Sequence, residues 1–145
     1  MVANPHPNAH PGSSAYTNAP QIAAEVVGLG VRAQAKAFAK VAHHGMLLET
    51  RVKANASGRP GPRSRSGDYR SSWTSRPSYD GDTIFNTVGT NKPQGRRLEH
   101  GFVGADRIGR VFNQPPFPHL APAVDAIRPA YMKDMANIVS WGGTR

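Results

Sequence analysis

The sequence predicts an α+β protein in which two helices pack on a small antiparallel sheet, with long projecting loops. Apolar residues recur at helical spacing over residues 21–53 and again over residues 119–141. An Asp-Gly pair at positions 80–81 separates two strand-like segments, which indicates a β-hairpin. The 15 glycines and 13 prolines of this 145-residue chain favour long connections between these elements.

Residues 1–20 are predicted to form an extended or disordered N-terminal arm, and residues 21–145 a single domain. The first 20 residues contain four prolines but no Lys or Arg, and they lack the apolar stretch of a secretory signal. A segment of this composition buries too little surface to offset its ordering entropy. In an assembly it would become an arm that lies on a neighbouring subunit.

A long helix is predicted from about residue 21 to residue 53. Pro20 suits a helix start, and Gly45 weakens the helix, so a bend is expected there. One stripe of this helix carries the apolar residues Ile22, Val26, Leu29, Ala33, Ala37, Val41, Leu48 and Val52.

Glycines and prolines in residues 54–67 predict a long loop, and the chain around it is basic. Five basic and no acidic residues occur from position 51 to position 65, namely Arg51, Lys53, Arg59, Arg63 and Arg65. Such a run suits contact with phosphates rather than with base edges. It equally suits a solvated loop that pairs with acidic residues of a neighbouring subunit.

After the loop, a helical turn is expected over residues 68–73, capped by Ser66 or Asp68. Strands over 73–79 and 82–88 follow. Pro77 marks the first as an edge strand, and the second is expected to be covered in part on both faces. Residues 93–100 are predicted as a short helix and residues 101–118 as an irregular stretch. The last helix should run from about 119 to 141 with a kink at Pro129, which cannot donate a backbone hydrogen bond.

The polar residues form no pattern that is typical of an enzyme. The chain has no Cys, its six histidines lack metal-ligand spacing, and no serine lies in a nucleophile elbow. We therefore expect no catalytic residues, no metal and no cofactor. Glu99 is expected in an ion pair with an arginine, and His119 as a capping or packing residue. No apolar run reaches the roughly 20 residues that a membrane span needs.

Several separated motifs, taken in order, resemble the small neck or tail-completion proteins of long-tailed bacteriophages, also called the minor tail component family. The resemblance covers residues 45–130. It is carried by LLETRVK (47–53), SGDYRSSW (66–73), VGTN (88–91), LEHGF (98–102), PPFPH (115–119) and PAVD (122–125).

This resemblance implies a non-enzymatic virion protein that is assembled in the host cytoplasm. It would form a homo-oligomeric ring, expected to be a hexamer, at the head–tail junction or at the upper end of the tail tube. Its partners would be the head-completion or connector ring and the tail-tube or terminator proteins, with genomic DNA passing through the channel. A tail terminator that caps the tube is the alternative within the family.

The resemblance also assigns fold- and assembly-forming positions, none of them catalytic. These are Gly67, Asp68, Tyr69, Gly89, Asn91, Glu99, Gly101, Pro118, His119 and Pro122. The chain departs from the family where His100 replaces an apolar or aromatic residue, and residues 1–20 have no counterpart. Outside the family, the net charge of +9 also fits a free basic protein that binds nucleic acid without sequence preference.

Overall fold

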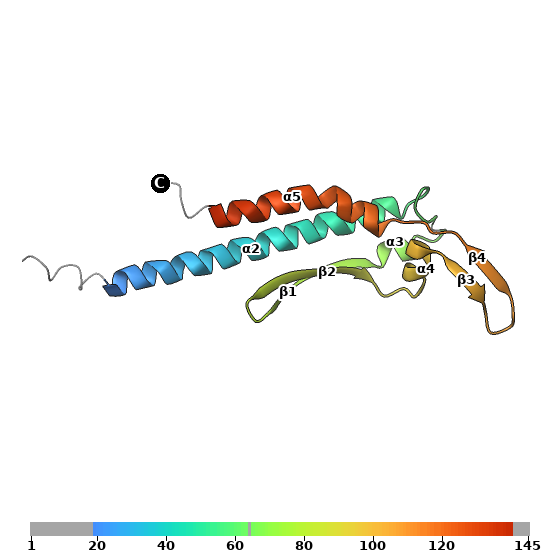
Figure 1. The fold of residues 1–145 in the computed structure, drawn as a ribbon, viewed down its shortest axis with the longest axis horizontal. Coiled ribbons are helices and arrows are strands. Elements are labelled where there is room, and N and C mark those ends of the chain that lie inside the picture. The colour runs from blue at the N-terminus through green and yellow to red at the C-terminus, as the bar shows by residue number, and fades with distance from the viewer. Residues whose placement is uncertain (1–18, 64, 141–145) are drawn as a thin grey trace, which may run out of the picture. The chain divides into compact units, whose positions relative to one another are not determined.

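The computed structural model describes residues 19–63 and 65–140. The chain divides into two compact units, Met1–Ala35 and Lys36–Arg145. The long helix α2 (Ala19–Asn55) begins in the first unit and ends in the second (Figure 1). The predicted helix is confirmed and is slightly longer than expected at both ends. Most of the predicted N-terminal arm lies outside the described residues, and Pro20 is already helical.

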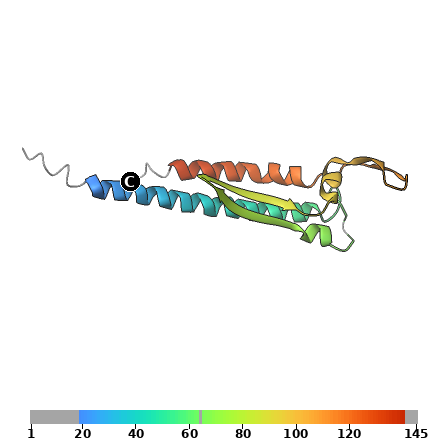
Figure 2. The ribbon, with the colours of Figure 1, turned by 90° about the horizontal axis from the view of Figure 1, so that it is seen from below.

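The second unit combines helices with two antiparallel hairpins, so the predicted α+β class is confirmed. Helix α5 lies antiparallel to the part of α2 that follows Lys36, and the first hairpin runs along another side of that part (Figures 1 and 2). The elements after α2 are α3 (Asp68–Ser71), β1 (Trp73–Asp80), β2 (Thr83–Thr90), α4 (Gln94–His100), β3 (Phe102–Ala105), β4 (Val111–Gln114) and α5 (Leu120–Ser140).

The first hairpin pairs Trp73 with Thr90 at its base and Asp80 with Thr83 at its end. Its two-residue loop is therefore residues 81–82, one position later than the predicted Asp-Gly turn. Gly81 has φ 56°, and glycine adopts this left-handed backbone without strain. Both faces of β2 are covered in part, as expected: Ile84 and Val88 are half-buried, and Phe85 on the other face is 40% exposed.

A second hairpin replaces the irregular stretch expected over residues 101–118. Strands β3 and β4 pair antiparallel from Phe102 opposite Gln114 to Ala105 opposite Val111. Asp106 builds the turn, because its Oδ1 accepts hydrogen bonds from the backbone N–H groups of Ile108 and Arg110, each at 3.0 Å. This hairpin has no strong signal in the sequence, because its strands are only four residues long and the Asp106 side chain, rather than an Asn-Gly or Asp-Gly pair, holds its turn.

The buried core lies where the end of α2 meets α3, the start of β1 and the start of α5. It consists of Val52, Ala56, Tyr69, Trp73 and Ala123, and Leu48, Val88, Leu98 and Leu120 pack against it at partial burial. Val52 and Ala123 are fully buried. A core this small leaves much of the chain's apolar surface exposed.

Gly45 allows the first hairpin to lie close to α2. An added Cβ would come within 2.7 Å of Ser75 Oγ and closer still to the amide of Asn86. That amide donates a hydrogen bond to the carbonyl of Val41 at 3.3 Å. The helix is continuous through Gly45, so this glycine is needed for close packing. The predicted bend there stays a prediction.

The bounds and caps of the remaining helices can be compared with the predictions. The N-cap residue of helix α3 is Gly67, in the left-handed conformation at φ 79°, and the Ser66 hydroxyl accepts a hydrogen bond from the Asp68 N–H at 3.3 Å. The short helix predicted at 93–100 is confirmed as α4. Helix α5 includes Pro129 within its length, and the kink predicted there stays a prediction.

Candidate functional site

Glu99, in the last turn of α4, caps the start of α5. Its Oε2 accepts hydrogen bonds from the backbone N–H groups of His119 and Leu120 at 3.0 Å, and its Oε1 accepts one from Ala121 at 2.9 Å. The first N–H groups of a helix have no partner within that helix, and they favour a negative charge. The expected ion pair of Glu99 with an arginine is therefore wrong, since the carboxylate binds a helix N-terminus instead.

The pKa of the Glu99 carboxyl reflects this role. Burial raises it, but the three N–H groups of Ala121, His119 and Leu120 favour the ionised form more strongly. The net effect is a pKa below the ordinary value of 4.5. Glu99 is thus ionised at neutral pH, which suits a helix cap and does not suit a proton donor.

His119 is fully buried and connects four elements. Its Nδ1 lies 2.9 Å from the carbonyl of Phe117 and 3.0 Å from Glu99 Oε2, both acceptors, so Nδ1 carries the proton. Its Nε2 then accepts a hydrogen bond from the Tyr69 hydroxyl at 2.6 Å. The His119 carbonyl accepts another from Asn55 Nδ2 at 2.9 Å. His119 is therefore a packing residue that joins α2, α3, α4 and α5.

Aromatic edge-to-face contacts complete this centre. The ring of His119 lies 5.5 Å from that of Tyr69 and 5.6 Å from that of Trp73, nearly perpendicular to each. Burial raises the pKa of Tyr69 to about 12. A hydroxyl that stays protonated and donates to a buried ring nitrogen serves packing. We call Tyr69, Trp73, Glu99 and His119 the aromatic–carboxylate centre.

The other positions assigned by the resemblance lie around this centre. Gly101 has φ 79°, and a Cβ there would lie 2.9 Å from the carbonyl of Gln114, so the backbone needs glycine. Gly89 is half-buried in β2. The remaining positions are exposed: Asp68, Asn91, Pro118 and Pro122. Asp68 and Asn91 line one shallow depression, and Pro118 and Pro122 line another together with Arg59.

The five predicted basic residues have different surroundings in the structure. Lys53 pairs with Glu49 on the same helix at 2.5 Å, and the guanidinium of Arg59 lies over the ring of Phe117 at 3.8 Å. Arg51 is exposed on α2. Arg63 and Arg65 are exposed and line one depression of about 330 Å³ together with Lys92.

The fold adds cations that the charge run did not reveal. Lys92 also lines a neighbouring depression of about 420 Å³ with Arg76 and a third of about 360 Å³ with Arg96. These residues come from β1, from the β2–α4 connection and from α4, so no local sequence signal joins them to the loop. We call Arg63, Arg65, Arg76, Lys92 and Arg96 the basic surface.

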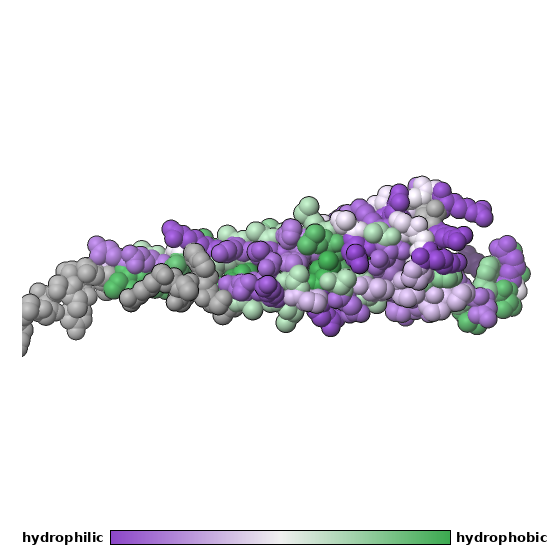
Figure 3. All heavy atoms as spheres, turned by 90° about the horizontal axis from the view of Figure 1, so that it is seen from above, coloured by the Kyte–Doolittle hydropathy of each residue, from purple (hydrophilic) through white to green (hydrophobic). Residues whose placement is uncertain are grey.

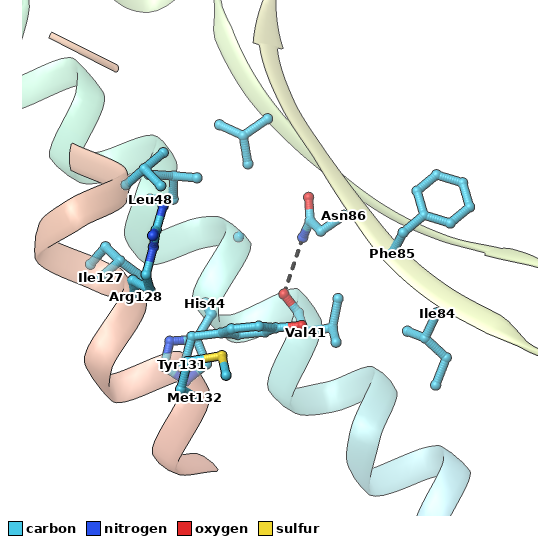
Figure 4. Close-up of a pocket in the computed structure, with 13 residues that line it drawn as sticks. Val41, His44, Leu48, Ile84, Phe85, Asn86, Ile127, Arg128, Tyr131 and Met132 are labelled. Atoms are coloured by element: carbon cyan, nitrogen blue, oxygen red, sulfur yellow. Dashed lines mark hydrogen bonds between the residues drawn. The ribbon is translucent and has the colours of Figure 1, made fainter. Parts of the chain in front are cut away.

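An apolar groove of about 690 Å³ lies between α2, β2 and α5 (Figure 4). Figure 4 shows Asn86 reaching from β2 to the carbonyl of Val41 in this groove. The apolar lining includes Val41, Leu48, Ile84, Val88, Ile127 and Tyr131.

A polar cluster joins α2 to α5 beside the groove. Asp134 Oδ2 accepts hydrogen bonds from His44 Nε2 at 2.9 Å and from Lys40 Nζ at 3.0 Å. These bonds, His44 first, hold the pKa of the Asp134 carboxyl below its usual value. The cluster fixes the antiparallel pairing of the two helices, because His44 is buried against the ring of Tyr131.

Apolar side chains are exposed on the second hairpin. Val103, Ile108 and Val111 each expose about three quarters of their surface, at 78%, 74% and 79%. Figure 3 shows hydrophobic residues at this end of the second unit. Ile22, Val26 and other apolar residues of α2 in the first unit are exposed as well.

Within residues 19–63 and 65–140, no three His, Cys, Asp or Glu side chains are grouped as metal ligands would be. No helix among the same residues is long and apolar enough to cross a membrane. Comparison of the chain with models of protein families, with curated proteins and with solved structures finds no match.

Proposed function

We propose that this chain is a structural virion protein of a long-tailed bacteriophage. In this proposal, identical copies form a ring at the head–tail junction or at the upper end of the tail tube. The ring joins head and tail and leaves a channel for DNA. The family resemblance of residues 45–130 suggests this role, and the exposed apolar hairpin supports it.

The observation that carries the proposal is the surface of β3 and β4. Large apolar side chains that are mostly exposed on a projecting hairpin gain stability when a partner covers them. A ring subunit has such a partner in the next copy, because a head-to-tail interface around a closed ring buries two different surfaces of each subunit. The small core is consistent with a fold that is completed on assembly.

The aromatic–carboxylate centre supports the same proposal. Three of the positions assigned by the resemblance, Tyr69, Glu99 and His119, bond to one another there. Each holds an element in place, and the ionised Glu99 and the protonated Tyr69 are poorly suited to proton transfer at neutral pH. Their arrangement fits a scaffold that presents surfaces to partners.

The test measures the mass of the purified chain over a concentration series by mass photometry and analytical ultracentrifugation. A ring predicts a defined multiple of 15.6 kDa that appears as concentration rises. Electron microscopy of the assembled species should then show a closed ring with a central channel. A chain that stays monomeric at every concentration, and is absent from purified virions, would contradict the proposal.

A deletion in the phage separates the two family roles. Loss of a neck protein should leave filled heads and tails of normal length that fail to join. Loss of a tail terminator should give tails of irregular length, because nothing stops growth of the tube. Electron microscopy of the lysate distinguishes these outcomes.

The basic surface favours a second candidate, a free protein that binds nucleic acid without sequence preference. It predicts DNA binding by the monomer that falls steeply as salt rises. Tight binding by a chain that never forms a ring would favour this candidate over the virion protein.

A further inference from the structure

We propose that the basic surface binds the phosphate backbone of double-stranded DNA, with Lys92 at its centre. This inference rests on the proposed function, in which DNA passes the assembled ring. It extends the expected contact from the loop of residues 54–67, which supplies Arg63 and Arg65, to a surface that the fold assembles from four separate segments.

The position of Lys92 carries the inference. It lines all three adjoining depressions, which contain Arg63 and Arg65 in the first, Arg76 in the second and Arg96 in the third. Cations that are spread over three adjoining depressions suit a regularly charged polymer, since its phosphates recur along the strand. A single small anion would need only one of these depressions.

The charge of this surface is not neutralised locally. Among residues 19–63 and 65–140, none of its five cations forms a salt bridge, whereas Lys53 pairs with Glu49 and Arg110 with Asp106. Two acidic residues line the depressions, Asp68 and Glu99. Glu99 is already bound to the N-terminus of α5, which leaves Asp68 against five cations.

Neutral donors accompany the cations. Thr74, Asn91 and Gln94 line the same depressions and are exposed. Hydroxyl and amide groups next to Lys and Arg are common partners of phosphate oxygens. The cations of this surface lie on β1, on the short helix α4 and on two connections rather than along one helix that could enter a groove. Contact with the backbone, independent of sequence, therefore fits this surface best.

The experiment measures binding of the full-length chain to fluorescent duplexes of two unrelated sequences, by anisotropy over a salt series. The variants Arg63→Gln, Arg65→Gln and Lys92→Gln each remove one charge of the basic surface. Arg107→Gln and Lys133→Gln are matched controls, because both side chains are exposed and lie on the second hairpin and on α5. Thermal unfolding of each variant checks that the fold is kept.

Each basic-surface variant should weaken binding about fivefold to tenfold near 0.1 M salt and reduce the salt slope by roughly one. The two duplexes should bind equally, and the controls should bind as the wild type does. Equal weakening by the controls would overturn the inference, because binding would then follow net charge alone. Tighter binding of polyglutamate than of duplex DNA at equal charge concentration would also overturn it, in favour of an acidic protein partner.

These outcomes are separate from the test of the ring. A chain that forms rings while its basic-surface variants bind DNA normally would overturn the inference and leave the proposed function intact. A chain that binds DNA through this surface but never assembles would support DNA binding by the basic surface and contradict the proposed ring.

Discussion

Glu99 Oε2 accepts a hydrogen bond from the backbone N–H of His119 at 3.0 Å, although the two residues are 20 positions apart in the sequence. The second hairpin lies between them in the chain. A further hydrogen bond from the Phe117 N–H to the Leu98 carbonyl, at 2.7 Å, joins the same two segments. The hairpin with its exposed apolar residues therefore projects from a closed base, which fixes its direction relative to α4 and α5.

Replacement of Glu99 by Gln should lower the free energy of unfolding by about 1–2 kcal/mol. The amide keeps the size of the side chain but loses the charge that the start of α5 favours. Urea denaturation followed by circular dichroism measures the change. Glu25→Gln is the matched control, because Glu25 is exposed on α2, and it should change stability by less than about 0.5 kcal/mol.

The contribution of Glu99 should also depend on pH. Because its pKa is lowered in the folded chain, its ionised form stabilises the fold fully above the ordinary value of 4.5. This stabilisation is lost as pH falls through the lower folded-state pKa. The stability gap between wild type and Glu99→Gln should therefore shrink below about pH 4. A gap that stays constant down to acid pH would contradict the role of the charge.

Replacement of Tyr69 by Phe should cost about 1–3 kcal/mol, because it leaves the buried His119 Nε2 without its donor. The wild type carries a tyrosine whose pKa rises from 10.0 to about 12 on folding. Its stabilisation is complete below pH 10 and is lost as pH rises through 12, a loss that Tyr69→Phe should lack. Denaturation at a series of alkaline pH values measures this.

Tyr79→Phe provides the control for this prediction. Tyr79 is half-exposed, and its ring stacks on Phe38 with a centroid distance of 4.6 Å, which the Phe ring would keep. Its stability should change by less than about 0.5 kcal/mol. Equal losses of stability in both variants would show that the hydrogen bond from Tyr69 to His119 does not contribute to the free energy of unfolding.

The long helices and the first hairpin could be predicted because their signals are local. The apolar repeat from Ile22 to Val52 has helical spacing, and the Asp80-Gly81 pair marks a chain reversal. The second hairpin has neither signal. Its turn is held by one carboxylate, Asp106, and its base by Glu99, so it depends on contacts that only the fold creates.

The same distinction applies to the candidate site. The resemblance selected Tyr69, Glu99 and His119, but the role of Glu99 required knowing that α4 ends beside the start of α5. The run of basic residues in the sequence includes Lys53 and Arg59. In the fold, Lys53 pairs with Glu49 and the guanidinium of Arg59 lies over the ring of Phe117. The run did not include Lys92, which lies 27 positions after Arg65 in the sequence and meets it in one depression only in the fold.

Replacement of Gly45 by Ala should destabilise the fold by about 1–3 kcal/mol, although Ala favours helices. Its Cβ would displace Asn86 from its bonds to Val41 and Ser75. Gly28→Ala is the matched control, since nothing lies within 4 Å of its added Cβ, and it should stabilise by up to about 1 kcal/mol. Thermal and urea denaturation measure both.

A double-mutant cycle tests the cause. Asn86→Ala removes the group that the new methyl displaces, so Gly45→Ala should cost less in the Asn86→Ala background than in the wild type. A coupling of at least about 0.5 kcal/mol is expected between the two sites. Additive losses would show that the contact with Asn86 of β2 does not cause the stability cost of a side chain at position 45.

Replacement of Val111 by Asp should weaken ring assembly without unfolding the subunit, if the proposed function holds. Val111 is 79% exposed on β4, so a charge there costs the monomer little. Cover by a neighbouring copy would bury it, and loss of a buried valine costs about 1.5–3 kcal/mol, or at least about tenfold in association. Asn113→Asp adds the same charge on the same exposed strand without removing an apolar group. Mass photometry over a concentration series should show weaker assembly for Val111→Asp alone. Equally weak assembly of Asn113→Asp would mean that charge repulsion, and not the lost apolar contact, causes the effect.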